Sequence, residues 1–110
     1  MPKQMSFDSF GINFPESYWE VAHINISLID KQGSITFFGY ANKKARENGD
    51  RIIANKTYRV TPQIFADYFP NIASESELIG GSYAMAENIK DTVIGKDGQA
   101  YSFFNNSTDA

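Results

Sequence analysis

Residues 17–60 read SYWEVAHINISLIDKQGSITFFGYANKKARENGDRIIANKTYRV and contain three runs rich in aromatic and β-branched residues. In the first run, INISL at residues 24–28 places two isoleucines and Leu28 on one face of a half-buried strand. The second run, residues 34–41, carries apolar side chains on both faces, which predicts a central strand covered on both sides. The third, residues 55–60, alternates again. These runs predict an antiparallel sheet.

The connectors and the second half of the chain predict turns and short helices. Gly33 is expected to supply the positive φ of a tight turn after the first strand. Residues 43–49 favour a single helical turn or a polar loop. Thr61, followed by proline, is typical of a helix start. The double glycine at residues 80–81 predicts a break, with Ser82 as the cap of a second short helix over residues 83–90.

The N-terminal segment, residues 1–16, has apolar side chains, but Gly11 and Pro15 interrupt any regular pattern. We expect an extended arm that docks its aromatic rings on its own sheet or on a neighbouring protein. Deletion of the arm should lower the melting temperature in the first case and weaken partner binding in the second.

We therefore predict a single α+β domain of 110 residues, with an antiparallel, sandwich-like sheet of about five or six strands and one or two short helices. Its parts are an N-terminal arm (1–16), the β-strands (17–60), a short helical region (61–91), a β-hairpin (92–104) and a frayed polar tail (105–110).

Composition excludes several kinds of chemistry. The chain has no cysteine, so thiol nucleophiles, disulfides and cysteine metal sites are absent. Its single histidine, His23, lies within a predicted strand and has no second ligand or nucleophile near it in the sequence. No apolar stretch is long enough to span a membrane, and the first residues lack the apolar centre of a signal peptide.

Two further patterns receive structural interpretations. Ser74 and Glu77 fit a helix capping box rather than a catalytic carboxylate site. The glycines before Ser82 resemble an anion-binding turn, but they lack the spacing of a phosphate loop and favour a hinge between helices. We expect no catalytic residue, no cofactor and no metal ion.

Charge is distributed unevenly along the chain. The net charge is −3, yet residues 43–59 carry six of the ten basic residues and have a local charge of +4. This segment is either a docking surface or a solvated connector. Phe37, Phe38 and Tyr40 precede it, a combination that can bind single-stranded nucleic acid. The acidic remainder and the alternation of these aromatics between two faces argue against nucleic acid.

The strand pattern of residues 18–90 resembles small structural proteins of siphophages that infect Gram-positive bacteria, above all tail-region proteins of Bacillus siphophages. The shared features are a Tyr-Trp opening at Tyr18 and Trp19, an aromatic second strand, an ARENG-like basic connector and a K-x-Y-x-V strand. The resemblance implies a β-rich module of the kind that assembles tail tips and baseplates. It assigns no chemical role to any residue.

The predicted function is a non-enzymatic structural or binding module of a phage tail, a tail-tip or baseplate accessory component that acts through protein–protein contacts. The alternative is a small phage-encoded regulator or inhibitor that binds a host protein. We expect virion or tail proteins as partners, no nucleic acid and no membrane. The sequence leaves the oligomeric state open and is compatible with a monomer. Synthesis is expected in the bacterial host cytoplasm and final location in the virion. Trp19 is either buried or an interface anchor. The candidate interaction residues are Lys43, Lys44, Arg46, Arg51, Phe7, Phe10, Phe14 and Trp19.

Overall fold

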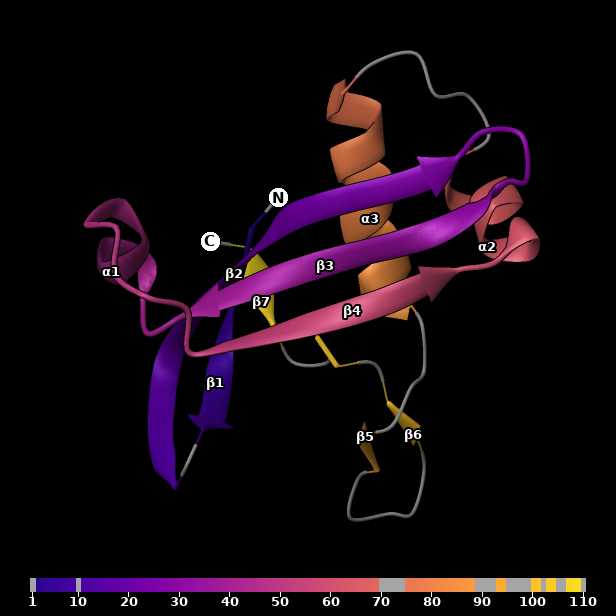
Figure 1. Cartoon of the computed structure of the whole chain (residues 1–110). Coiled ribbons are helices and arrows are strands. Elements are labelled where there is room, and N and C mark those ends of the chain that lie inside the picture. The colour runs from indigo at the N-terminus through magenta and orange to yellow at the C-terminus, as the bar shows by residue number, and fades with distance from the viewer. Residues whose placement is uncertain are drawn as a thin grey trace.

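The computed structural model describes residues 2–9, 11–69, 75–88, 93–94, 100–101, 103–104 and 107–109. Within these residues the chain forms an α+β fold with a five-stranded antiparallel sheet, in the order β4-β3-β2-β1-β7, and a separate two-stranded pair, β5-β6 (Figure 1). The elements are β1 (Lys3–Ser9), β2 (Ile12–Ser27), β3 (Gln32–Tyr40), α1 (Lys43–Glu47), β4 (Ala54–Val60), α2 (Pro62–Tyr68), α3 (Glu75–Asn88), β5 (Val93–Ile94), β6 (Ala100–Tyr101) and β7 (Thr108–Asp109).

The long strand β2 connects two hairpins. Its residues from Ile12 to Trp19 pair with β1, and those from Tyr18 to Ser27 pair with β3. The two pairings share only Tyr18 and Trp19, so β1 and β3 flank different halves of β2 (Figure 1).

The expected N-terminal arm is instead a strand of the sheet. β1 and the start of β2 form an antiparallel hairpin around Gly11, which has the positive φ of 78° that such a turn needs. The register shifts between Met5 and Phe7, opposite the part of β2 that contains Pro15. A bulge is where a strand tolerates proline, because the missing N–H is not required there. Gly11 and Pro15, which interrupt the apolar pattern in the sequence, therefore lie in a turn and in a bulge.

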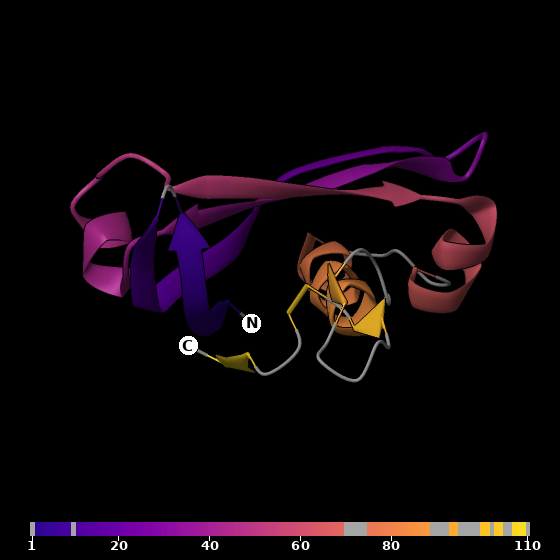
Figure 2. The ribbon, with the colours of Figure 1, turned by 90° about the horizontal axis from the view of Figure 1, so that it is seen from below.

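The sheet is open rather than part of a sandwich. Figure 2 shows α2 and α3 on one side of the sheet, with the other side free of any element that the structure describes. The core lies on the helix side, around Trp19, Ile35, Phe37 and Val60, each fully buried. The expectation that both faces of β3 are covered is therefore wrong, because a single layer of helices covers one face.

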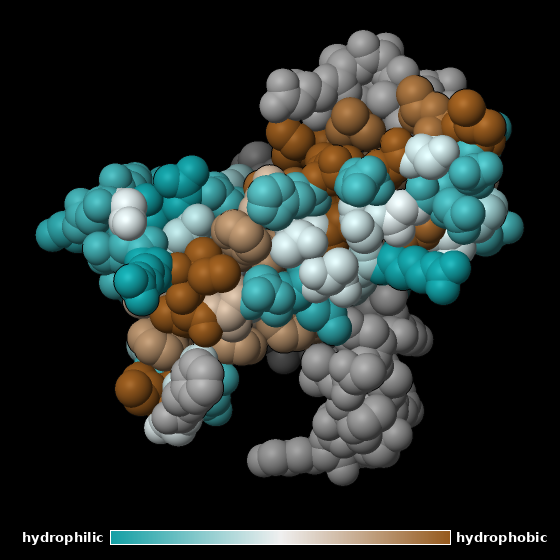
Figure 3. Space-filling model, viewed as in Figure 1, coloured by the Kyte–Doolittle hydropathy of each residue, from teal (hydrophilic) through white to brown (hydrophobic). Residues whose placement is uncertain are grey.

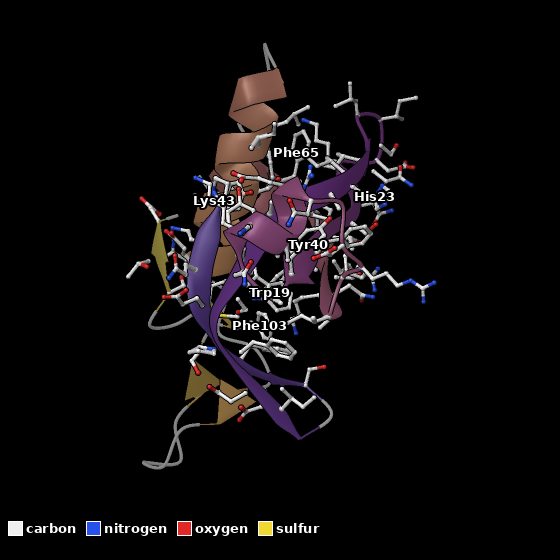
Figure 4. All side chains as sticks on the ribbon, turned by 90° about the vertical axis from the view of Figure 1, so that its left-hand side faces the viewer. Trp19, His23, Tyr40, Lys43, Phe65 and Phe103 are labelled. Carbon is white, nitrogen blue, oxygen red and sulfur yellow. The ribbon has the colours of Figure 1, made fainter. Side chains whose placement is uncertain are left out.

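Trp19 is the centre of an aromatic cluster on this face. Its ring meets those of Phe7 and Phe103 edge-on, with centroids 5.1 Å apart in both pairs. In Figure 4 Trp19 and Phe103 lie close together beneath the sheet. The indole N–H donates to Ser17 Oγ over 2.9 Å, and that hydroxyl donates to the Met5 carbonyl. The buried polar atoms are thus satisfied within the cluster.

Leu28 does not share the buried face with Ile24 and Ile26. The strand ends at Ser27, and Leu28 lies in the following turn with 66% of its surface exposed, while both isoleucines are half-buried. The positive φ in this turn belongs to Lys31 (56°) rather than to Gly33. The alternation of apolar residues in the sequence therefore extends one residue beyond the end of β2.

The two longer helices pack against each other through a glycine. α2 begins as predicted, with the Thr61 hydroxyl accepting from the Ile64 N–H over 3.3 Å. α3, however, continues through Gly80 and Gly81, so these residues are neither a break nor a hinge. A Cβ on Gly81 would lie 2.6 Å from the Tyr68 carbonyl oxygen, so glycine permits the close approach of α2. The predicted capping box falls on residues whose side chains lie outside those described.

Ser82 is a buried residue within α3 rather than a helix cap. Its hydroxyl donates to the Leu78 carbonyl one turn earlier, over 2.8 Å. That intrahelical bond satisfies the hydroxyl inside the core and removes the need for a partner outside the helix.

The C-terminal segment forms two strand pairings. β5 and β6 make the predicted hairpin, with Val93 opposite Tyr101, and its turn lies outside the described residues. Within the predicted frayed tail, Thr108 and Asp109 are instead paired, because β7 lies beside β1 and brings the two ends of the chain together (Figure 1). Lys3, which is buried, forms ion pairs with Asp109 of β7 and Glu87 of α3. These charges hold β7, β1 and α3 to one another.

Candidate docking surface

The basic segment of the sequence forms one corner of the molecule. Helix α1 starts at the Asn42 cap, whose side-chain oxygen accepts from the Ala45 N–H over 2.7 Å. Ala45 is buried and anchors the helix, which leaves Lys43 and Lys44 exposed. Among the residues that the structure describes, neither lysine forms an ion pair. The helix therefore presents two cations on a fixed support.

Arg46 of α1 is exposed but reaches back to the sheet. Its guanidinium pairs with the Glu20 carboxylate of β2 and lies over the Tyr40 ring, 5.6 Å from the centroid. The hydrogen bond to Glu20 raises the pKa of Arg46 above its ordinary value. The pair is partly exposed, so its role is to fix the orientation of α1 rather than to add much stability. We call the surface formed by Tyr40, Lys43, Lys44, Arg46 and Arg51 the basic corner.

The open face of the sheet adjoins the basic corner. His23 is exposed on this face, and Figure 4 shows it on the side of the sheet away from α3. Its ring packs edge-on against Phe38, with centroids 5.3 Å apart. Thr36 and Thr57 share a hydrogen bond of 3.0 Å between their hydroxyls. The face offers half-exposed aromatic rings among polar groups that include the charged Arg59 of β4, in line with the aromatic second strand that the sequence predicts.

The other predicted interaction residues do not join the basic corner. Trp19 is fully buried, so it belongs to the core and is not an interface anchor. Phe7 is half-buried against it. Phe14, near the start of β2, lines a hollow of about 230 Å³ with Ile12, Ile52 and Ile53, and Ile52 directly follows Arg51 in the chain. Phe10 falls outside the described residues. Only the basic residues of the predicted surface lie together.

An apolar groove lies between β2 and α3, and sequence reasoning did not find it. It has a volume of about 470 Å³ and is lined mainly by apolar side chains. The lining residues are Pro2, Glu20, Val21, Ala22, Ile24, Leu78, Ile79 and Tyr83. The contributing segments are far apart in the chain, and no local pattern predicts that they meet.

Tyr83 ties the helix to the strand inside this groove. The Val21 N–H donates to Tyr83 Oη over 2.9 Å. Burial raises the pKa of Tyr83 to about 12, since the phenolate would lose its solvation there. The neutral phenol therefore serves as a hydrogen-bond partner for the strand.

The described part of the chain holds neither a metal-binding cluster nor a membrane-spanning helix. No three His, Cys, Asp or Glu side chains gather closely enough to hold a metal ion in the portion that the structure describes. No helix among those residues is long and apolar enough to cross a membrane. Comparison with protein-family models, curated proteins and solved structures returned no match.

Proposed function

We propose that this protein is a non-enzymatic binding module that docks through its basic corner on an acidic surface of a partner protein. The observation that carries the proposal is the presentation of Lys43 and Lys44, exposed and without an ion pair in the described chain, on a helix fixed by its cap and by buried Ala45. Two adjacent exposed lysines on a fixed helix can steer and orient an acidic partner, and the one acid of α1, Glu47, lies at the other end of the helix.

The neighbouring sheet face supports a protein partner rather than a strand of nucleic acid. Arg46 already pairs with Glu20, so part of the positive charge is neutralised within the molecule. Phe38 is engaged by His23, and Tyr40 lies beneath Arg46, which leaves little free ring surface for base stacking. Aromatic side chains among polar groups are, by contrast, common in protein interfaces.

The resemblance to siphophage tail proteins supplies the kind of partner, namely another structural protein of a phage tail. On this proposal the chain is made in the bacterial host and ends in the virion. Mass spectrometry of purified particles from a phage that encodes the chain tests the location. Its absence from particles while it is abundant in infected cells would contradict a tail role and favour the small-regulator alternative.

Charge reversal tests the basic corner itself. Lys43→Glu/Lys44→Glu should reduce the amount of this protein in purified particles at least tenfold, because repulsion replaces attraction at the contact. The matched comparison is Lys44→Glu against Lys31→Glu, which makes the same change in net charge at an exposed lysine in the turn after β2, outside the basic corner and the open face. Equal losses for both variants would contradict a localised docking surface.

Binding to nucleic acid provides the contrasting measurement. Fluorescence anisotropy with labelled single-stranded DNA and RNA should show only weak binding at physiological salt. Tight binding that falls steeply as salt rises would indicate several phosphate contacts and would overturn the protein-docking proposal.

A further inference from the structure

A hollow of about 230 Å³ lies where the end of the β1–β2 hairpin meets the segment that leads into β4. None of its lining side chains is charged, and all but one are apolar: Ser9, Ile12, Phe14, Ile52 and Ile53. Ile12 exposes 58% of its surface, and the other four are half-buried. The hollow therefore presents apolar surface to solvent.

The walls of the hollow are held by backbone hydrogen bonds. Ser9 Oγ donates to the Ile53 carbonyl over 3.1 Å, which ties the hairpin to the segment that enters β4. The Ile53 N–H donates to the Gly39 carbonyl of β3 over 2.8 Å, so the same segment is also held to the sheet. An occupant therefore meets a hollow that is already formed, and binding does not have to order its walls.

Positive charge borders the hollow on the side of α1. Exposed Arg51 directly precedes Ile52, and residues 43–59 keep a charge of +4 after both of their acids are counted. Figure 3 shows hydrophobic side chains gathered between the hydrophilic surface of α1 and the β1–β2 hairpin. The hollow thus lies outside the basic corner but directly beside it.

The acidic side chain at the end of the hairpin faces away from the hollow. Asp8 lies opposite Asn13 in the β1–β2 pairing and accepts from its amide over 2.7 Å. Successive strand residues point to opposite faces, so Asn13 points away from the face of Ile12 and Phe14. The negative charge of Asp8 is therefore kept off the hollow.

We propose that the hollow and the basic corner together bind one acidic segment of the partner protein, with a large apolar side chain of that segment seated in the hollow. The inference rests on the proposed function and adds the chemistry of the partner: a phenylalanine or leucine flanked by aspartates or glutamates. The carboxylates meet Arg51 and the lysines of α1, while the apolar side chain contacts Ile12 and Ile52. Apolar anchors supply much of the affinity of an interface, and complementary charges set its orientation.

The shape of the site favours a protein segment over an anionic membrane. A membrane takes up apolar side chains that project from a protein, whereas a hollow receives a side chain from its partner. The most exposed apolar side chains are Leu28 and Ile29, at 66% and 92%. They lie in the turn after β2, outside the basic corner, so they do not combine with its cations into one membrane-binding surface.

Binding is tested directly with blocked peptides and the isotope-labelled full chain. The probe peptide has one phenylalanine with three glutamates on each side. Its NMR titration should shift the amide signals of residues 51–53 and of Ile12 and Phe14. One control peptide replaces the phenylalanine by serine and the other replaces the glutamates by glutamines, and each should bind at least fivefold more weakly. A probe that causes no shifts up to about 5 mM, or that binds no better than either control, would overturn the proposal.

Substitution at the hollow gives a second test with the same probe. Ile12→Asn should weaken binding at least fivefold, because it removes apolar surface from the hollow. Leu28→Asn is the matched control, since Leu28 is exposed to a similar extent at the other end of β2, and it should leave the affinity unchanged. Circular dichroism checks that both variants fold, and the serine peptide makes the same comparison on the unaltered protein. Equal affinities of the two variants would exclude the hollow as the binding site.

Failure of this inference is distinguishable from failure of the proposed function. In purified particles, Ile12→Asn should lower the amount of the protein, as Lys44→Glu does. A loss with Lys44→Glu but not with Ile12→Asn would refute only the hollow, and a loss with neither would contradict docking through the basic corner. Vesicles of phosphatidylglycerol and phosphatidylcholine provide the contrast with a membrane. Vesicle binding that depends on both Lys44 and Ile12 would overturn the assignment to a protein segment.

Discussion

Trp19 lies where the two hairpins of the sheet meet, and its surroundings depend on its size. The strand neighbour opposite it is Gly39, and a Cβ at that position would come within 2.6 Å of the indole. The glycine thus leaves room for the ring, while Ser17 accepts its N–H and aromatic side chains surround its edges. A large ring fixed in this way accounts for much of the packing on the helix side of the sheet.

The contrast between Trp19 and Leu28 gives a test at the residue scale. Trp19→Ala should lower the free energy of unfolding by about 3–5 kcal/mol, because it removes a fully buried ring and leaves a cavity. Leu28→Ala should change it by less than about 0.5 kcal/mol, since Leu28 is mostly exposed. Urea unfolding at one dilute protein concentration measures both, because self-association would add stability. A large loss for Leu28→Ala would place that side chain in the monomer core.

At the scale of elements, α3 shows how one helix tolerates adjacent glycines. The helix crosses one face of the sheet, and Gly81 lies where α2 approaches it. Gly80, its neighbour, has nothing within 4 Å of a Cβ position. Glycine weakens a helix interior because it loses more backbone freedom on folding than other residues do. The loss of helix stability is therefore necessary at Gly81, where α2 approaches closely, and avoidable at Gly80.

The two glycines should respond in opposite ways to alanine. Gly80→Ala should stabilise the fold by up to about 1 kcal/mol, because the helix gains propensity without a clash. Gly81→Ala should destabilise it, because the new methyl group meets the Tyr68 carbonyl and the Phe69 ring. Thermal unfolding measured by circular dichroism compares the pair, and each variant is the control for the other. Stabilisation by both would mean that α2 does not pack closely on α3.

At the scale of the whole molecule, charges at the two ends of the chain close the sheet. Lys3, near the N-terminus, pairs with Asp109 beside it in β7 and with Glu87 in α3. The hydrogen bond and charge of Lys3 hold the pKa of Asp109 below its ordinary value. A carboxyl whose pKa is depressed by folding stabilises the native state above its unfolded pKa and loses that contribution as pH falls through the folded value.

Acid should therefore loosen the closure of the chain ends. Between neutral pH and about pH 3, part of the fall in stability should come from protonation of Asp109, whose unfolded pKa is near 3.9. Asp109→Asn should be less stable than the natural protein at pH 7 and should approach it at low pH. Urea midpoints across this pH range measure the difference, with exposed Asp50→Asn as the control. A constant gap between Asp109→Asn and the natural protein at every pH would show that the ion pair is not the cause.

Local patterns in the sequence determined the α+β class, the antiparallel strands of residues 17–60, the capped start of α2 at Thr61 and the hairpin that pairs β5 with β6. Each depends on neighbouring residues: the alternation of apolar side chains, a capping hydroxyl before proline, or a short hairpin. The sequence also located the basic corner, because its lysines lie within one short segment. That such a helix is anchored by Ala45 and braced by Glu20 was not visible in that segment.

Only the tertiary structure decided the features that depend on contacts between distant residues. β1 is a strand because β2 is long enough to hold a second partner, and β7 forms because Lys3 and Asp109 meet across the length of the chain. Gly81 remains helical because α2 packs beside it. The groove exists because β2 continues along α3 beyond the last residue that pairs with β1. Local propensity does not predict such contacts, since their energy comes from the packing of elements far apart in the sequence.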